Sequence, residues 1–326
     1  MRSDSSHVPT ATSISSCSIG QILDQSALAA PCDYIRSLPS KDIRKKLIDA
    51  FNIWFQLPND DINGIGQIIN DLHNASLILD DIQDDSLLRR GSPATHCIFG
   101  NAQSINSATY MFMNTCLMLQ HVPFSSPATM DILLKGMMEL FVGQSWELKW
   151  KFHVSCPSVP EYMAMIDGKT GAMFNLLVRL MHSMSQQDTF LLKYVRFATL
   201  LGRFYQVRDD YLNLLDDKYS EQKGFCEDLD EGKFSYPVVS CCNSDPSKQD
   251  LILGIFRQNG DGRSPLSKNT KMYILDLIKK SGAFEATCEL LNQLKQEVWE
   301  ALSDLEVATG QQNVGLRHIM KALSVV

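Results

Sequence analysis

Two clusters of carboxylates stand out as the residues best able to do chemistry in this chain of 326 residues. Asp80, Asp81 and Asp84 follow an apolar segment, and on a helix Asp80 and Asp84 share one face because they are four residues apart. Carboxylates stacked in this way repel one another, so we expect a cation beside them, and a set of oxygen ligands suits Mg²⁺. Taken alone, such a cluster is as often a solvated acidic helix end.

A second acidic cluster favours the metal-site interpretation. Asp209 and Asp210 end another apolar stretch, 129 residues beyond Asp80, and Asn213 lies four residues after Asp209. Local charge patterning does not explain so long a separation. We therefore expect the two clusters to converge on shared metal ions that in turn bind a polyanion.

Basic side chains also lie near the two clusters and near the first helix: Lys41, Arg44, Arg89, Arg90, Lys169, Lys218, Lys223 and Lys233. Any one of these is most often a solvated surface charge. Arg89-Arg90 and Lys169-Thr170, however, adjoin otherwise apolar helices, and an arginine fork can bind two phosphate oxygens at once. These positions favour a phosphate-bearing substrate.

Composition narrows the class of protein. Lys and Arg number 30 against 37 Asp and Glu, a net charge of −7, which argues against a nucleic-acid partner. Nine cysteines without a C-x-x-C pattern indicate neither a disulfide framework nor a zinc site, and they favour a cytoplasmic location. No segment reads as a signal peptide or membrane span. Residues 91–130 lack Asp, Glu, Lys and Arg, and we expect them to be buried or to line an apolar cavity.

The elements that must position these residues are helices. Residues 1–30 read as a flexible Ser/Thr-rich tail or linker, and residues 31–326 as one all-helical domain. Ser40 is a candidate N-cap for a helix that begins near Ile43. Apolar periodicity predicts further helices over about 62–80, 104–119, 128–150, 161–184, 188–217, 270–281 and 284–306. Strand signals are nearly absent, so the expected fold class is all-α, a single bundle of about ten or more helices.

At this point the chain resembles a known family. The segment 73–91, with its Asp80-Asp81-x-x-Asp84 and Arg89-Arg90-Gly91, resembles the first aspartate-rich motif of trans-isoprenyl diphosphate synthases. Residues 205–213 resemble the second motif in its eukaryotic geranylgeranyl diphosphate synthase form, and residues 223–237 match the same form. Residues 33–41 and 105–110 are most similar to the prenyltransferase half of fungal bifunctional terpene synthases. The resemblance implies the isoprenoid synthase fold, with helices around a central apolar substrate tunnel, and condensation of isopentenyl diphosphate with allylic diphosphates.

The resemblance also implies roles for the matching residues. Mg²⁺, three ions per site, would be held by Asp80, Asp81, Asp84 and Asp209, and the catalytic set would add Asp210 and Lys169, with Asp228 behind them. The allylic diphosphate would contact Arg89, Lys169, Thr170, Gln206, Lys223 and Lys233. Isopentenyl diphosphate would contact Lys41, Arg44, His73 and Arg90. Two residues depart from the pattern: Asn213 replaces an Asp of farnesyl-type enzymes, and Glu147 stands where the family has Asp, which leaves its role open.

Product length depends on the residues below the first motif. Ala75 and Ser76 lie about one helical turn, or ~5 Å, before Asp80, and their small size would let a growing chain pass. Large side chains on the uncharged helix would then form the floor: Tyr110, Phe112 and Met113. Core packing is the alternative reading of these three. The resulting expectation is a C20 product, geranylgeranyl diphosphate, with a C25 product, geranylfarnesyl diphosphate, as the alternative.

Two other functions fit the sequence less well. A class I terpene cyclase needs a second metal motif that ends in Glu, and the nearest match, from Asp216 to Ser220, is followed by Gly224 at that position. A non-catalytic synthase subunit should have lost one acidic cluster, whereas both are present here. The expected partners are small-molecule isoprenyl diphosphates, a second copy in a homodimer or higher homo-oligomer, and a fused or separate terpene cyclase.

Overall fold

The computed structural model describes residues 24–40, 42–123, 125–185, 190–215, 225–259 and 265–324. Its elements are, in chain order, α1 (Ser26–Ser37), α2 (Ile43–Phe55), α3 (Asn59–Gln83), β1 (Leu88–Arg89), β2 (Ser92–Pro93), α4 (Thr95–Phe99), α5 (Asn101–Gln120), α6 (Pro127–His153), α7 (Val159–Ile166), the π-helical turn η2 (Asp167–Gly171), α8 (Ala172–Met184), α9 (Leu191–Leu215), α11 (Glu227–Asp230), α12 (Tyr236–Ser244), α13 (Pro246–Gln258), α14 (Lys268–Lys280), α15 (Ala283–Thr309) and α16 (Val314–Leu323). The predicted all-α class is confirmed, since the only strands in the described ranges form one short antiparallel hairpin.

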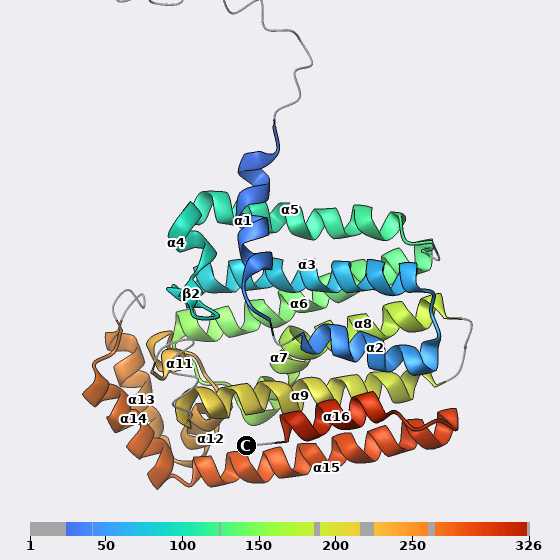
Figure 1. Ribbon diagram of the computed structural model, residues 1–326. Helices are drawn as coiled ribbons and strands as arrows, with labels where there is room; N and C mark the ends of the chain where they lie inside the picture. Colours follow the sequence, from blue (N-terminus) through green and yellow to red (C-terminus); the bar gives the residue numbers. More distant parts are fainter. Residues whose placement is uncertain are drawn as a thin grey trace, which may run out of the picture.

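The helices stack in layers (Figure 1). α5 packs on α3, α3 on α8, α8 on α9, and α9 on α15, while α6 packs against α8 and η2. α1 crosses α5 and α3, and α16 returns to pack on α2. The two helices that carry the acidic clusters, α3 and α9, are therefore central, with α8 between them.

Both central helices are long enough to cross the whole domain. Each has 25 residues, which corresponds to a length of about 37 Å. The buried side chains of α3 include Ile65, Ile68, Ile69 and Leu72, at the spacing of one helix face. The acidic cluster follows where α3 ends, at Gln83, so its carboxylates emerge at the edge of the packed core.

An aromatic cluster fixes α2 against α9 at the other side of the bundle. The rings of Phe55 and Tyr194 lie 4.7 Å apart and those of Phe51 and Phe197 lie 5.9 Å apart. Trp54 is buried and donates its indole N–H to the carbonyl of Gln311 at 3.0 Å. Such pairs add to the free energy of burial and hold the helices in one relative position.

Three sequence expectations about boundaries need correction. α1 begins at Ser26, so part of the expected tail is helical. The N-cap position of α2 belongs to Asp42, in a left-handed conformation, and Ser40 instead accepts a hydrogen bond from the Asp42 N–H. The helix expected over 161–184 is three elements, because the chain widens into η2 between α7 and α8.

The uncharged stretch is only half buried. On α5, Ala108 and Met111 face the core, but Met113 and Leu117 are 63% and 56% exposed. The expectation that this stretch is buried or lines an apolar cavity was therefore wrong for the outer side of this helix, although Phe112 does line the cavity. No helix in the described ranges is long and apolar enough to cross a membrane.

Candidate active site

Both acidic clusters border one cavity of about 600 Å³ inside the bundle. Asp80 reaches it from the end of α3, and Asp209 from α9. Lys169 and Lys233 line the same cavity. The structure thus brings together two acidic segments that are far apart in the chain, with cations between them.

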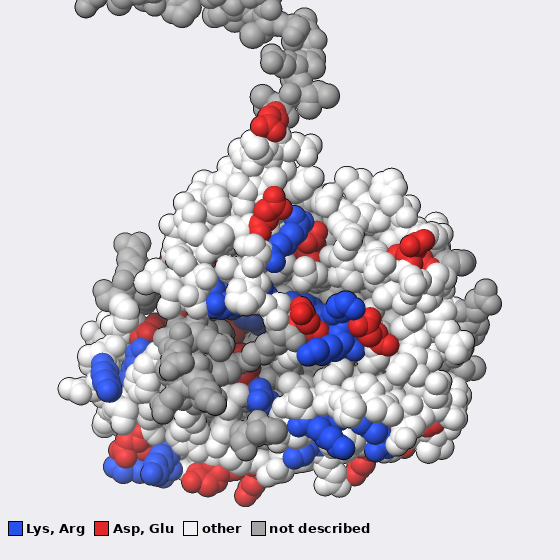
Figure 2. Space-filling model, in the orientation of Figure 1, with Lys and Arg blue, Asp and Glu red and all other residues white. Residues whose placement is uncertain are grey.

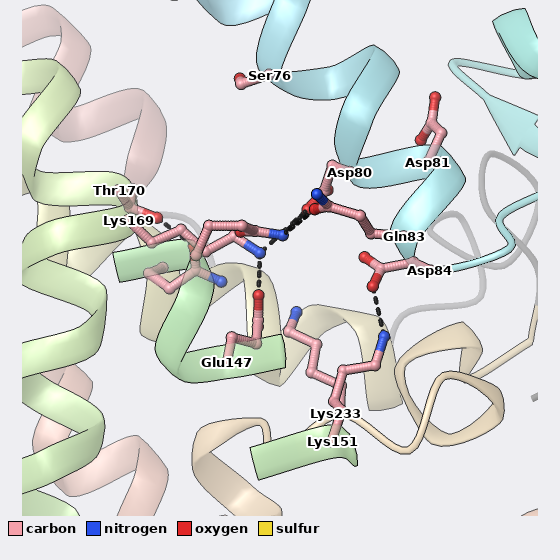
Figure 3. A network of polar contacts seen from close by, with 12 residues as sticks. Ser76, Asp80, Asp81, Gln83, Asp84, Glu147, Lys151, Lys169, Thr170 and Lys233 are labelled. Carbon is pink, nitrogen blue, oxygen red and sulfur yellow. Dashed lines mark hydrogen bonds and ion pairs between the residues drawn. The ribbon is translucent and has the colours of Figure 1, made fainter. Parts of the chain in front are cut away.

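The carboxylates of the first cluster are held by side chains from α6 and η2 (Figure 3). Asp80 accepts hydrogen bonds from Gln144 at 3.1 Å and from Lys169 at 3.2 Å. Asp84 forms an ion pair with Lys151, from the last turn of α6. Burial, followed by the charge of Asp80, raises the pKa of Asp84, and Lys151 opposes that shift. The repulsion expected between Asp80 and Asp84 is therefore offset by lysines of the same chain.

Asp81 has a different surrounding from its neighbours. Its side chain is fully buried, does not line the cavity, and points away from Asp80 and Asp84 (Figure 3). Arg89 donates from Nε to Asp81 at 2.7 Å, and its NH2 group lies 3.7 Å from Asp80. Asp81 therefore holds Arg89 at the cavity wall, which differs from the metal-ligand role expected for it.

The second cluster also divides into one residue in the cavity and one behind it. Asp209 lines the cavity, whereas Asp210 is fully buried. Asp210 accepts hydrogen bonds from the Tyr162 hydroxyl at 2.5 Å, from Gln206 at 2.9 Å and from the backbone N–H of Tyr236 at 2.8 Å. These donors fix Asp210 as an anchor between α7, α9 and α12, away from the position expected of a catalytic group.

Lys233 links this anchor to the cavity. Its ammonium lies 3.1 Å from Asp228 and 3.3 Å from Asp210. Although burial acts against the charged form, these two carboxylates raise the pKa of Lys233 well above its ordinary value. Asn213 accepts a hydrogen bond from the backbone N–H of Asp228 at 3.2 Å. The Asn that replaces the Asp of farnesyl-type enzymes therefore gives this N–H a neutral acceptor.

A glycine-lined contact positions Lys169 and Thr170. Both belong to η2, and π-helical turns are frequent at functional sites. A Cβ on Gly143 of α6 would lie well within 3.0 Å of the Lys169 backbone nitrogen, and one on Gly202 would lie 2.8 Å from the Cα of Gly171. η2 is therefore clamped between two helix backbones. Thr170 donates to Gln206 at 2.5 Å, and both side chains line the cavity.

A second group of nitrogen-bearing side chains lines the cavity from α2, α3 and the hairpin. Arg44, His73 and Arg90 all line it. Burial and the nearby Arg90 lower the pKa of Arg44 to about 10. Burial, followed by Arg44, lowers the pKa of His73 well below its ordinary value, so the imidazole is neutral at pH 7. The charged Arg44 and Arg90, with the neutral His73 beside them, make a site suited to an anion.

Lys and Arg side chains gather around the middle of the face shown in Figure 2. Arg44 and Arg90 are half-buried and line the cavity. Two further cations expected at the site, Lys41 and Lys223, lie outside the described residues.

Part of the cavity lining is apolar. Leu140, Phe141, Met173 and Phe174 line the cavity together with Phe112, and the rings of Phe112 and Phe141 lie 5.1 Å apart.

Only some of the residues expected to set product length border this space. Ser76 lines the cavity, whereas Ala75 is fully buried and does not line it. Tyr110 and Met113 are exposed on the outer side of α5, so Phe112 alone of the three expected floor residues borders the cavity.

Sequence reasoning missed Gln144, Lys151, Tyr162 and Phe141. A signal was present for two of them, because Gln144, Glu147 and Lys151 recur at three- and four-residue spacing along one side of α6. Glu147, whose role the sequence left open, is buried and pairs with Lys169. Burial acts to raise its pKa, but the charges of Lys169 and Lys233 outweigh this and lower it.

The donor set fits a hard divalent cation. Asp80 of α3 and Asp209 of α9 are carboxylates that line the cavity, and oxygen ligands are those that Mg²⁺ prefers. Among the described residues, no three His, Cys, Asp or Glu side chains are gathered closely enough to hold one ion. Lysines lie between the carboxylates instead. Of the carboxylates expected to bind metal, Asp80 and Asp209 line the cavity, whereas Asp84 does not line it and pairs with Lys151.

Comparison with known proteins agrees with this geometry. Residues 25–272 match the family model for polyprenyl synthetases. The chain is similar to a sesterterpene synthase of Colletotrichum orbiculare, with 46% identity over 310 residues, which cover 92% of this chain and 43% of that protein. It is similar to sesterfisherol synthase of Neosartorya fischeri, with 45% identity over 92% of this chain and 40% of that protein.

One shorter relative is covered over most of its length. This is a geranylgeranyl pyrophosphate synthase of Zymoseptoria tritici, 45% identical over 300 residues, which cover 92% of this chain and 82% of that protein. By contrast, the chain spans less than half the length of the two relatives named before it.

Proposed function

Because the chain belongs to the polyprenyl synthetase family, we propose that it is a Mg²⁺-dependent prenyltransferase that condenses isopentenyl diphosphate with dimethylallyl, geranyl and farnesyl diphosphates to make geranylgeranyl diphosphate. One observation carries this proposal. The lining of a single cavity combines carboxylates and lysines, a group of Arg and His side chains, and a set of apolar side chains. These are the three environments that two diphosphates and a growing hydrocarbon chain require.

The allylic diphosphate is assigned to the wall formed by η2 and α9. Lys169, Thr170, Gln206 and Lys233 lie there, with Arg89 at its edge, and their donors can stabilise charge that develops on the leaving diphosphate oxygens. Asp80 and Asp209, with Asp84 four residues after Asp80, would hold Mg²⁺, which would supply further charge stabilisation at that diphosphate.

Isopentenyl diphosphate is assigned to Arg44, His73 and Arg90. That group orients the double bond of isopentenyl diphosphate toward the allylic carbon, which becomes cationic as its C–O bond breaks. The double bond attacks this carbon, and loss of a proton to the departing diphosphate completes the step. No protein nucleophile is required.

The floor that limits the product is assigned to Phe112 and Phe141. They are among the apolar residues that line the cavity, and their ring centroids lie 5.1 Å apart. A C20 product is the first candidate, and the similarity to a geranylgeranyl pyrophosphate synthase supports it. A C25 product is the second candidate, favoured by the similarity to sesterterpene synthases.

Product analysis tests both candidates. The purified chain is incubated with Mg²⁺, isopentenyl diphosphate and each allylic diphosphate, and the dephosphorylated products are separated by chain length. Geranylgeraniol as the main product supports the first candidate, geranylfarnesol the second, and no condensation refutes the proposed function. Phe141→Ala should lengthen the product, whereas Phe152→Ala on the same helix should not, because Phe152 is 83% exposed and does not line the cavity.

A second copy of the chain is proposed to cover the outer side of α5 and α6. Met113 and Leu117 on α5, and Leu134, Met138 and Val142 on α6, are all exposed. Monomers rarely expose so continuous an apolar surface. The expected state in sedimentation velocity is a homodimer.

A terpene cyclase, fused or separate, is proposed as the consumer of the product, in keeping with the longer relatives.

A further inference from the structure

Lys169 is the cation on which the proposed allylic site depends most, and it lies between two carboxylates. Its ammonium is 3.2 Å from Asp80 and also pairs with Glu147 (Figure 3). The two carboxylates are not equivalent. Asp80 lines the cavity and is 23% exposed at its side chain, whereas Glu147 does not line the cavity and its side chain is 7% exposed.

The demands on the two carboxylates also differ. Asp80 is shared by Gln144 and Lys169, lies 3.7 Å from Arg89, and belongs to the cluster proposed to hold Mg²⁺. Glu147 pairs with Lys169 behind the cavity wall. A carboxylate that binds a metal ion has less charge left to attract an ammonium. Lys169 would then depend on Glu147 for its position.

The packing of α6 explains how Glu147 reaches Lys169. Gly143 lets the backbone of α6 touch that of η2 beside Lys169, and Glu147 follows one turn later on the same face of α6. The close approach of the backbones therefore brings this carboxylate beside the ammonium. Removing the charge of Glu147 would leave Lys169 buried beside Asp80 alone.

We propose that Glu147 is a positioning residue for the reaction: it keeps the Lys169 ammonium directed at the diphosphate when Asp80 is engaged by a metal ion. This rests on the proposed function and assigns Glu147 to Lys169, as opposed to the metal. Glu147 acts on substrate only through Lys169.

A double-mutant cycle tests the assignment, because two residues that act as one unit give non-additive effects. The variants are Glu147→Gln, Lys169→Gln and the double variant. Glu139→Gln, an exposed Glu on the same helix, is the matched control. The first measurement is the dissociation constant of inorganic diphosphate in the presence of Mg²⁺, by titration calorimetry, which needs no turnover.

Glu147→Gln and Lys169→Gln should each weaken inorganic diphosphate binding about tenfold or more, the size of a lost charge-assisted hydrogen bond. The double variant should be no weaker than Lys169→Gln, and Glu139→Gln should match the wild type. Multiplied losses in the double variant would refute the proposal. A Glu147→Gln variant that binds diphosphate normally would refute it too.

A second measurement separates positioning from metal binding. The Mg²⁺ concentration for half-maximal activity should be unchanged in Glu147→Gln, while KM for the allylic diphosphate rises; a raised Mg²⁺ requirement would identify Glu147 as a metal ligand and overturn the proposal. Should Glu147→Gln fail to fold, Glu147→Asp serves instead. It keeps the charge but shortens the side chain by one methylene, and it should weaken diphosphate binding by less than Lys169→Gln does. Equal losses in those two variants would contradict the proposal.

Failure of the positioning role and failure of the proposed function remain distinguishable. A chain that shows the non-additive diphosphate binding but makes no prenyl product with any allylic substrate would refute the proposed function alone. A chain that makes product but shows additive losses would refute the role of Glu147 alone.

Discussion

Replacing Gly143 by Ala adds one methyl group at the place where α6 touches η2. A Cβ there would lie well within 3.0 Å of the backbone nitrogen of Lys169, a separation that real Cβ atoms essentially never show. The atom in the way is backbone, with no flexible side chain to move aside. The two helices must therefore separate by several tenths of an ångström along a packed contact.

Two opposing contributions set the expected loss of stability. Overpacking a tight contact costs about 1–3 kcal/mol, and a clash with backbone belongs at the upper end of that range. The change from Gly to Ala within a helix returns roughly 0.8–1 kcal/mol. Gly143→Ala should therefore lower the free energy of unfolding by about 2 kcal/mol.

The same displacement moves Lys169 relative to Asp80, and we expect kcat/KM for the allylic substrate to fall by about tenfold or more.

Gly254→Ala is the matched control. Gly254 lies within α13, and a Cβ there would meet nothing within 4 Å, so only the gain in helix propensity remains. This variant should be more stable than wild type by roughly 0.5–1 kcal/mol with unchanged kcat/KM. Urea denaturation and initial-rate assays measure both quantities. Equal stability of the two variants, or full activity of Gly143→Ala, would show that the contact between α6 and η2 does not position Lys169.

Three further predictions follow from the same geometry. Asp209→Asn should lower kcat by about a hundredfold or more with little change in Tm. Asp210→Asn should lower the free energy of unfolding by about 2–4 kcal/mol, because the buried donors around it and Lys233 lose a charged partner. The opposite pattern in melting and rate measurements would reverse the two roles. His73→Ala should raise KM for isopentenyl diphosphate more than KM for the allylic substrate, and an equal rise in both would contradict the two-site assignment. Ser76→Phe should shorten the main product. Ala75→Phe should lower Tm but leave the product length unchanged. Product chromatography that shows the reverse would place the tunnel on the other side of α3.

The fold and the location of the site were largely predictable from the sequence. Helical periodicity identified α3, α5, α6, α9, α14 and α15 to within a few residues, because each has an apolar face with 3.6-residue spacing. The convergence of Asp80 and Asp209 on one cavity followed from their type and separation. The break at η2 was not predictable in this way, because the apolar periodicity of the sequence continues through the π-helical turn. Gly168 and Gly171 are the only sequence features that mark it.

The sequence was a weaker guide to which of two neighbours faces the cavity. Asp80 and Asp81 are adjacent, as are Asp209 and Asp210, yet in each pair the first residue lines the cavity and the second is fully buried. Helical geometry turns successive side chains by about 100°, so this division depends on the rotation of α3 and α9 within the bundle. That rotation is fixed by tertiary packing.

The buried member of each aspartate pair has the same task in both motifs. Asp81 holds Arg89, and Asp210, together with Asp228, holds Lys233. In each case a buried carboxylate secures a cation that lines the cavity, while the neighbouring carboxylate lies at the cavity edge, where we propose that it binds a metal ion. An Asp-Asp dipeptide at the end of a helix can therefore serve two functions at once, because its two side chains point to different sides of the wall. This accounts for paired aspartates in both motifs where metal binding alone would need only one of each pair.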